Sequence, residues 1–130
     1  MRPMPSPAPP SLSTIAERVY ATAYEALDND DLRTAERFFG LLLLLAPRDE
    51  RAWIGLAVVR ERKEDWAMAA ARYLLGGALV PDSAWCHIGR GRALLQLGRG
   101  HEADEAFAEA ESVTSDAALL RVIERERDPS

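Results

Sequence analysis

The sequence predicts an all-α fold of three helical hairpins followed by a C-terminal capping helix. Small residues recur at a constant interval and aromatic residues follow each of them four positions later: Ala35, Ala69 and Ala103, then Phe39, Tyr73 and Phe107. Breaks keep the same interval at Asp30, Glu64 and Gly98, and Pro47 and Pro81 follow the first two units. A period of about 34 residues, with small, aromatic and proline positions in this order, is typical of a helix-turn-helix repeat.

This pattern resembles the tetratricopeptide repeat over about residues 17–115. The resemblance implies a solenoid in which each hairpin packs on the next one. We expect repeats at about 16–48, 50–82 and 84–115, within a repeat domain that covers residues 13–128. Residues 1–12 are rich in proline, which lacks the amide donor of helices and sheets, so they are expected to form a disordered tail.

The first hairpin has clear start and stop signals. Ser11 or Ser13 is expected to cap a helix that runs to Ala26 or Leu27, and the acidic turn at 28–31 ends it. A second helix is predicted from Leu32 to about Leu45. Its apolar residues cover nearly the whole circumference, so we expect this helix to be buried between its neighbours.

The later helices are marked in the same way. Helices are predicted over about 49–62 and 66–79, with Gly76 and Gly77 allowing close approach of a neighbouring backbone. Two more are predicted over 84–97 and 101–112. A seventh, over about 117–127, has a narrow apolar stripe that suits a capping helix at 116–127.

Composition restricts the class of function. The 130 residues carry a net charge of −5, which argues against a nucleic-acid surface, although residues 51–100 are basic. The longest apolar run, Leu41 to Ala46, is too short to insert in a bilayer. Cys86 stands alone and the N-terminus lacks the apolar core of a signal peptide, so a cytoplasmic location is expected.

The sequence offers no enzyme signature and no cofactor or metal site. Cys86 and His87 are adjacent on a helix and point about 100° apart, so they do not face each other. His87 is expected to be packed and His101 to face solvent. The acidic turn at 28–31 lacks the glycine and the closing glutamate of a calcium loop.

The expected binding surface is the concave side of the solenoid, lined by the first helix of each hairpin. Its inward residues are apolar or aromatic with two arginines, which we expect to fix the register of an extended peptide or to bind carboxylates. For Leu27, Ile54 and Val58, packing against neighbouring helices is an equal alternative. The predicted peptide-binding groove consists of Tyr20, Tyr24, Leu27, Arg51, Ile54, Val58, Trp85, Ile88, Arg92 and Leu95.

A narrower resemblance covers Tyr20 to Glu102. This stretch is similar to the class II chaperones of bacterial type III secretion, on a set of residues spread over all three hairpins: Tyr20, Tyr24, Ala35, Phe39, Asp49, Arg51, Gly55-Leu56, Arg60, Tyr73, Gly76, Ala93-Leu94-Leu95-Gln96, Gly98 and Ala103. The resemblance implies a chaperone that holds an extended segment of a hydrophobic translocator, or of a related secreted subunit, before export. It also implies that Tyr20 and Tyr24 line the groove.

Other interpretations stay open. One is a general tetratricopeptide scaffold for protein–protein interaction, and another is a co-chaperone of a needle subunit. A carboxylate clamp needs Lys and Asn at the groove positions that Tyr20 and Tyr24 occupy. A homodimer also stays open, because a proline-rich tail stands where the resembled chaperones have a longer helical region used in dimerisation.

Overall fold

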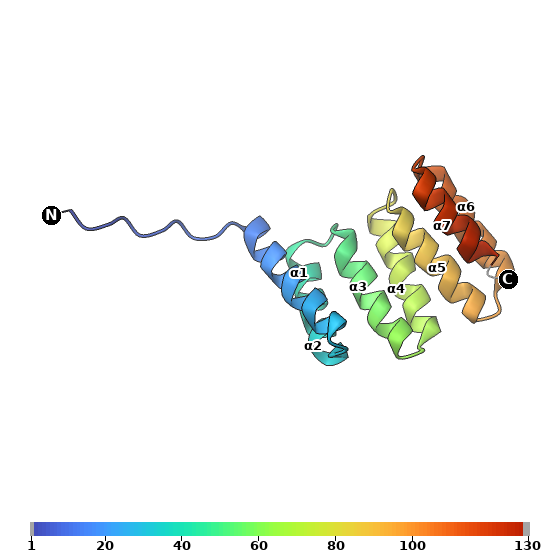
Figure 1. The fold of residues 1–130 in the computed structure, drawn as a ribbon, viewed down its shortest axis with the longest axis horizontal. Coiled ribbons are helices and arrows are strands. Elements are labelled where there is room, and N and C mark those ends of the chain that lie inside the picture. Colours follow the sequence, from blue (N-terminus) through green and yellow to red (C-terminus); the bar gives the residue numbers. More distant parts are fainter. Residues whose placement is uncertain (1, 129–130) are drawn as a thin grey trace.

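The computed structural model describes residues 2–128, and over that range it is built of α-helices and turns with no strand (Figure 1). The all-α fold predicted from the sequence is confirmed. Residues 2–10 form an extended, exposed segment that leads away from the first helix. The helices are α1 (Leu12–Asp28), α2 (Leu32–Leu45), α3 (Glu50–Arg62), α4 (Trp66–Leu79), α5 (Ala84–Gln96), α6 (Gly100–Val113) and α7 (Ala117–Arg127).

Short polar side chains set the helix starts. The oxygen of a side chain just before the helix accepts a hydrogen bond from a backbone amide in the first turn, which satisfies a donor that the helix leaves free. The breaks that recur once per repeat share one conformation, because Asp30, Glu64 and Gly98 all have positive φ angles, of 57°, 57° and 73°. The capping residues are Ser11, Asp31, Asp49, Asp65, Ser83 and Asp116.

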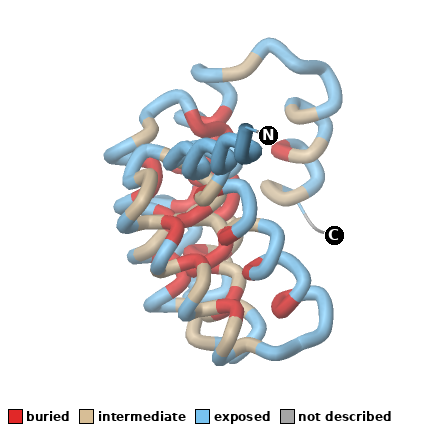
Figure 2. Tube along the Cα trace, turned by 90° about the vertical axis from the view of Figure 1, so that its left-hand side faces the viewer, coloured by how far each residue is buried: buried red, intermediate tan, exposed pale blue. Residues whose placement is uncertain are grey.

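The hairpins form two layers. Each helix contacts the next one along the chain, and contacts also join α1 to α3, α3 to α5 and α5 to α7. The backbones of α2 and α4, and those of α4 and α6, do not come close to each other, although one ion pair, between Glu36 and Arg72, spans α2 and α4. The odd-numbered helices therefore form a continuous inner layer, whereas the even-numbered helices stand apart on the outer side. Buried residues concentrate where neighbouring helices face each other (Figure 2).

The repeated small and aromatic positions form the core, as predicted. Ala35, Ala69 and Ala103 are fully buried, and the three aromatic residues four positions later are buried with them. Gly76 lies at the expected crossing point, since a Cβ there would come within 2.6 Å of the Cβ of Trp53 and 2.9 Å of the Sγ of Cys86. Only a residue without a side chain fits such an approach.

The expectation that α2 is buried all round is wrong. Leu42 is fully buried, but Leu44 on the opposite side is 81% exposed and Leu41 is 40% exposed. The reason is the layering: α2 packs on α1 and α3 and does not pack against α4, to which only the ion pair between Glu36 and Arg72 reaches, so one side of α2 faces outward. Helix α2 therefore carries more leucine side chains than its packing buries.

Candidate peptide-binding groove

The inner layer carries an open apolar cavity of about 370 Å³ at the junction of α1, α3 and α5. Seven of the predicted groove residues line it together: Tyr20, Tyr24, Leu27, Arg51, Ile54, Val58 and Trp85. These residues come from the first helix of each hairpin, since helices α1, α3 and α5 stack side by side.

Aromatic side chains form the accessible part of this groove. Tyr24 is 54% exposed and Trp85 is 44% exposed, whereas Leu27 is nearly buried at its base. The rings of Tyr20 and Tyr24 lie 6.0 Å apart between centroids, and the ring of Tyr20 meets Phe39 edge-on at 6.4 Å. Rings at such distances support one another and give a preformed apolar wall with polar hydroxyl ends.

The side chain of Arg51 is already paired with carboxylates of the same chain. Its guanidinium donates to both carboxylate oxygens of Glu17, at 2.6 and 3.2 Å, and to both of Asp49, at 2.8 to 3.3 Å. Hydrogen bonds from this guanidinium lower the pKa of the Glu17 and Asp49 carboxyls, and the two carboxylates raise the pKa of Arg51. The expectation that Arg51 binds the carboxylates of a peptide is therefore not supported by its contacts.

The side chain of Arg92 is also paired within the chain. It donates to the Oε1 of Glu61 at 2.7 Å and to the hydroxyl of Tyr73 at 3.2 Å, and it lies 3.5 Å from Glu126 of α7. Burial, together with the negative charge of Glu61, raises the pKa of the Tyr73 hydroxyl. This network joins α3, α4, α5 and α7, so Arg92 belongs to the scaffold.

The other groove residues predicted from the third hairpin do not line the cavity. Ile88 is fully buried, in a core cluster that includes Ile123 of α7. Leu95 is partly buried and packs against the same cluster. The prediction of Ile88 as a groove contact is wrong, because α7 lies against α5 and the inner side of the third hairpin packs with it.

Phe39, Glu50 and Gly55 also line the cavity and were not predicted as site residues. Gly55 is explained by its neighbour, since a Cβ at this position would overlap the ring of Phe39. The repeat could have revealed this glycine position. One repeat later, a Cβ at Gly89 would likewise overlap the ring of Tyr73, the residue equivalent to Phe39. A glycine on the inner helix thus receives the aromatic ring of the preceding hairpin.

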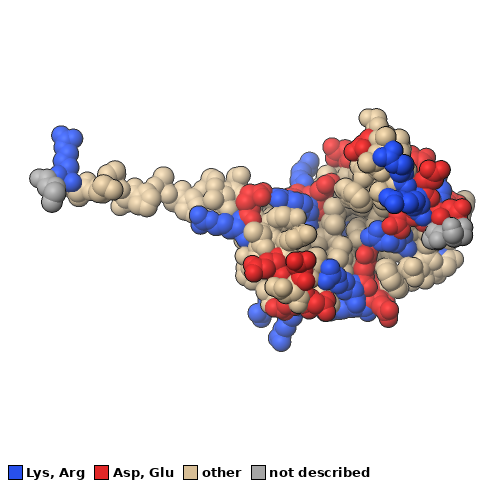
Figure 3. Space-filling view, viewed as in Figure 1, with Lys and Arg blue, Asp and Glu red and all other residues tan. Residues whose placement is uncertain are grey.

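Acidic residues flank the groove on the side of α1. A second open cavity of about 460 Å³ shares Tyr20 and Tyr24 with it and is bordered by Glu17, Glu25 and Asp28. Figure 3 shows uncharged atoms across the middle of this face, with charged side chains on both sides. Because Arg51 is neutralised by Glu17 and Asp49, the end of the groove beside Glu25 and Asp28 is negatively charged.

The residues considered for chemistry are dispersed. Cys86 is buried, and burial raises the pKa of its thiol. His87 is also buried, with its Nε2 at 2.9 Å from the carbonyl oxygen of Pro81 and its Nδ1 at 3.3 Å from Glu109. Residues 2–128 contain no group of three or more metal-binding side chains placed to share an ion. Over the same residues, none of the helices has the length and apolar character needed to cross a bilayer.

No family model and no curated protein matches the sequence, but many solved structures match the fold. The Yersinia enterocolitica type III secretion chaperone SycD, in complex with a peptide of the translocator YopD, has a TM-score of 0.78 at 20% identity over 87% of this chain and 89% of that chain. The TPR2B domain of yeast Sti1 in a complex with pHsp70 has a TM-score of 0.78 at 17% identity over 86% and 92% of the two chains.

An enzyme is also among the similar structures. The O-GlcNAc transferase of Thermobaculum terrenum has a TM-score of 0.71 at 21% identity over 85% of this chain, but the match covers only 21% of the transferase. Most of the similar structures are chaperones or tetratricopeptide-repeat domains. At these identities the similarity establishes the architecture, and this chain has the tetratricopeptide-repeat fold.

Proposed function

We propose that this protein is a type III secretion chaperone. Its groove binds an extended segment of a hydrophobic translocator, or of a related secreted subunit, and keeps that client soluble in the cytoplasm before export. The observation that carries the proposal is the open aromatic groove, in which Tyr20, Tyr24 and Trp85 from two helices face the same cavity. The similarity to SycD with a bound translocator peptide supports it.

The contacts of the groove define the chemistry of the segment it accepts. Exposed tyrosine and tryptophan rings favour apolar or proline side chains, because they supply rigid apolar surface with little loss of side-chain freedom. Glu25 and Asp28 border the groove and favour a basic residue at that end. The client segment is therefore apolar, extended and basic toward the C-terminal end of α1.

The same contacts disfavour an acidic peptide in the groove. A carboxylate needs a free cation, whereas Arg51 and Arg92 already pair with Glu17, Asp49 and Glu61. The second candidate function is binding of other polypeptide segments, either as a general tetratricopeptide scaffold or as a co-chaperone of a needle subunit. The identity of the client distinguishes these functions, since only the first requires a membrane-active secreted protein.

Co-expression tests the groove. The protein is produced together with a hydrophobic translocator subunit of a type III secretion system, and the soluble complex is purified and quantified. Tyr20→Ala/Tyr24→Ala removes most of the exposed aromatic wall, so we expect the affinity for the client segment to fall about tenfold or more. The matched control is Leu44→Ala/Leu75→Ala, which removes exposed apolar side chains from the outer helices instead.

The result is decisive in either direction. Loss of complex with the tyrosine variant but not with the leucine variant supports the groove. Equal complex yield from both variants contradicts it, provided that circular dichroism shows both to be folded. If no complex forms with wild-type protein, isothermal titration with synthetic segments of other secreted subunits separates the scaffold from the chaperone function.

A further inference from the structure

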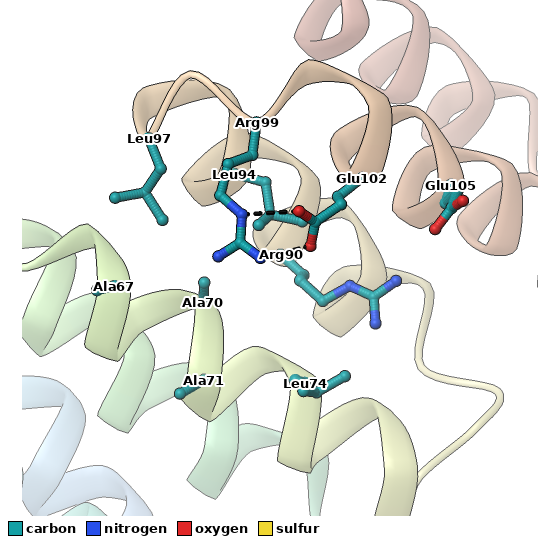
Figure 4. Close-up of a pocket in the computed structure, with 10 residues that line it drawn as sticks. All are labelled: Ala67, Ala70, Ala71, Leu74, Arg90, Leu94, Leu97, Arg99, Glu102 and Glu105. Atoms are coloured by element: carbon teal, nitrogen blue, oxygen red, sulfur yellow. Dashed lines mark hydrogen bonds and ion pairs between the residues drawn. The ribbon is translucent and has the colours of Figure 1, made fainter.

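A separate cavity of about 340 Å³ opens on the outer side, where α4 faces α5 and the start of α6 (Figure 4). Small alanine side chains of α4 line one wall, and leucines of α5 and of the turn after it line the other. None of its lining residues lines the peptide groove. The lining includes Ala67, Ala70, Ala71, Arg90, Leu94 and Leu97.

The repeat explains why this cavity exists between the second and third hairpins. One repeat earlier, on α2, the positions of Ala67, Ala70 and Ala71 are occupied by Arg33, Glu36 and Arg37. Glu36 fills its space by pairing with Arg60 at 2.7 Å and with Arg72 at 3.4 Å. Alanines on α4 have no such side chains, and a hollow remains.

Arg90 places a positive charge in this hollow. The equivalent residue one repeat earlier is Leu56, which is 5% exposed in the core. The Nε of Arg90 is buried and has no hydrogen-bond partner, a feature it shares with the Nε atoms of Arg60 and Arg127. Among residues 2–128, Arg90 is the one partly buried arginine that does not pair with a carboxylate. The partly buried arginines that do so are Arg51, Arg60, Arg72, Arg92 and Arg127.

The nearby carboxylates form no ion pair with Arg90. Glu102 pairs with Arg99, with two hydrogen bonds of 2.7 and 2.8 Å, and this pair closes on itself at the rim (Figure 4). Glu105 also lines the cavity and forms no ion pair with Arg90; its carboxylate lies 3.4 Å from the ring of His101, which is charged only when protonated. Because the guanidinium of Arg90 has no carboxylate partner in the part of the chain that the structure describes, an incoming carboxylate gains a charge-assisted contact that the folded chain leaves unmade.

We propose that this outer cavity is a second binding site, which takes a partner polypeptide presenting a carboxylate side chain beside an apolar one. The carboxylate pairs with Arg90, and the apolar side chain fills the space between Ala70, Ala71 and Leu94. A polypeptide fits because the cavity is open to solvent along its apolar lining, where Leu74 and Leu97 are 51% and 37% exposed. The groove and this site therefore select opposite charges.

Nuclear magnetic resonance on the whole chain tests the site with short blocked peptides. The probes are Ac-Ala-Phe-Glu-Ala-NH₂, its Gln analogue without the charge, and Ac-Ala-Ala-Glu-Ala-NH₂ without the ring. We expect the Phe-Glu peptide to shift the Nε–Hε signal of Arg90 and the methyl signals of Ala70 and Ala71. Its Kd is expected to be at least fivefold lower than that of either analogue.

Variants separate the charge from the cavity. Arg90→Leu copies Leu56, so the fold is retained, and it should abolish the preference for Glu over Gln. Ala71→Leu fills the cavity without changing its charge and should weaken the Phe-Glu peptide at least fivefold. Arg121→Leu removes an exposed arginine outside the cavity and should have no effect.

Three outcomes overturn the proposal. They are equal binding of the Glu and Gln peptides, shifts that map away from the cavity, and equal shifts of Arg90 with sodium acetate, which would mean a generic anion contact. The proposal does not depend on the function of the groove. Tyr20→Ala/Tyr24→Ala protein should bind the Phe-Glu peptide as wild type does, so failure of one site is distinguishable from failure of the other.

Discussion

The guanidinium of Arg51 lies 4.2 Å from the ring centroid of Tyr20 and holds that ring against the inner face of α1. The same guanidinium pairs with Glu17, one repeat earlier in the sequence, and with Asp49 at the cap of α3. The aromatic wall of the groove is thus fixed by a cation that also joins α1 to α3. Arg51 positions the groove and does not need to contact a bound peptide.

Arg51→Ala is expected to destabilise the protein by about 1 kcal/mol. Exposed ion pairs contribute little, but this one loses paired hydrogen bonds to two carboxylates and a ring contact together. Urea unfolding followed by circular dichroism measures the change. Arg48→Ala, an exposed arginine without an ion pair among the described residues, is the control and should leave the midpoint within error.

The cost of Arg51→Ala should depend on pH. Arg51 lowers the pKa of Asp49 and Glu17 in the folded protein, so the stability they contribute is present above their unfolded pKa values of about 3.9 and 4.3. It is lost as the pH falls through the lowered folded values, because both states then bind the same protons. Unfolding at pH 7 and at pH 2.5 should show the difference between wild type and variant shrinking. A difference that stays constant across this range would contradict the pairing.

The helix boundaries were predictable because their signals are local. Asp31 and Ser83 cap helices through their own side chains, and the sequence shows them directly before the periodic residues. The helix predicted from Leu32 to about Leu45 ends where α2 ends. The core positions were equally readable, since the repeat places Ala35 and Phe39 in surroundings that recur in every hairpin.

The binding surface was predictable only where the surroundings repeat. Ile54 and Ile88 occupy the same position in successive hairpins, yet Ile54 lines the groove and Ile88 is buried beside α7. The periodicity of the sequence predicts the packing within one hairpin, but it does not show which other helix covers that hairpin. The pairing of Arg92 with Glu61 and Glu126 was hidden for the same reason, because its partners come from other helices.

Substitutions on α2 distinguish its two sides. Leu42→Ala removes a fully buried side chain and should cost about 2–5 kcal/mol of unfolding free energy. Leu44→Ala, two residues later, removes an 81% exposed side chain and should change stability by less than about 0.5 kcal/mol. Urea unfolding of both variants measures the contrast. A large loss of unfolding free energy for Leu44→Ala in a monomeric sample would contradict the exposure of this side of α2.

Cys86 should resist modification in the folded protein. It is fully buried, and burial raises the pKa of its thiol, which disfavours the reactive thiolate. Ellman's reagent at pH 8 is expected to label it only at the rate of unfolding, and at once in concentrated guanidinium chloride. A cysteine placed in the exposed tail by Ser6→Cys provides the accessible control and should react immediately in the native state. Equal rates at both positions would contradict the burial of Cys86.

Two glycines should respond in opposite directions to the same change. Gly55→Ala places a methyl group against the packed ring of Phe39, so we expect destabilisation of about 1–3 kcal/mol despite the better helix propensity of alanine. Gly40→Ala puts the same methyl into open space within α2 and should stabilise by about 0.5–1 kcal/mol. Chemical denaturation of both variants provides the comparison.

The mechanism at Gly55 can be isolated with a double variant. Phe39→Leu removes the ring that the new methyl would meet, so Gly55→Ala should cost much less in that background than in wild type. Equal costs in the two backgrounds would mean that the clash with Phe39 is not the cause. Because Phe39 and Gly55 both border the groove, the single variant should also weaken peptide binding, whereas Gly40→Ala should leave it unchanged.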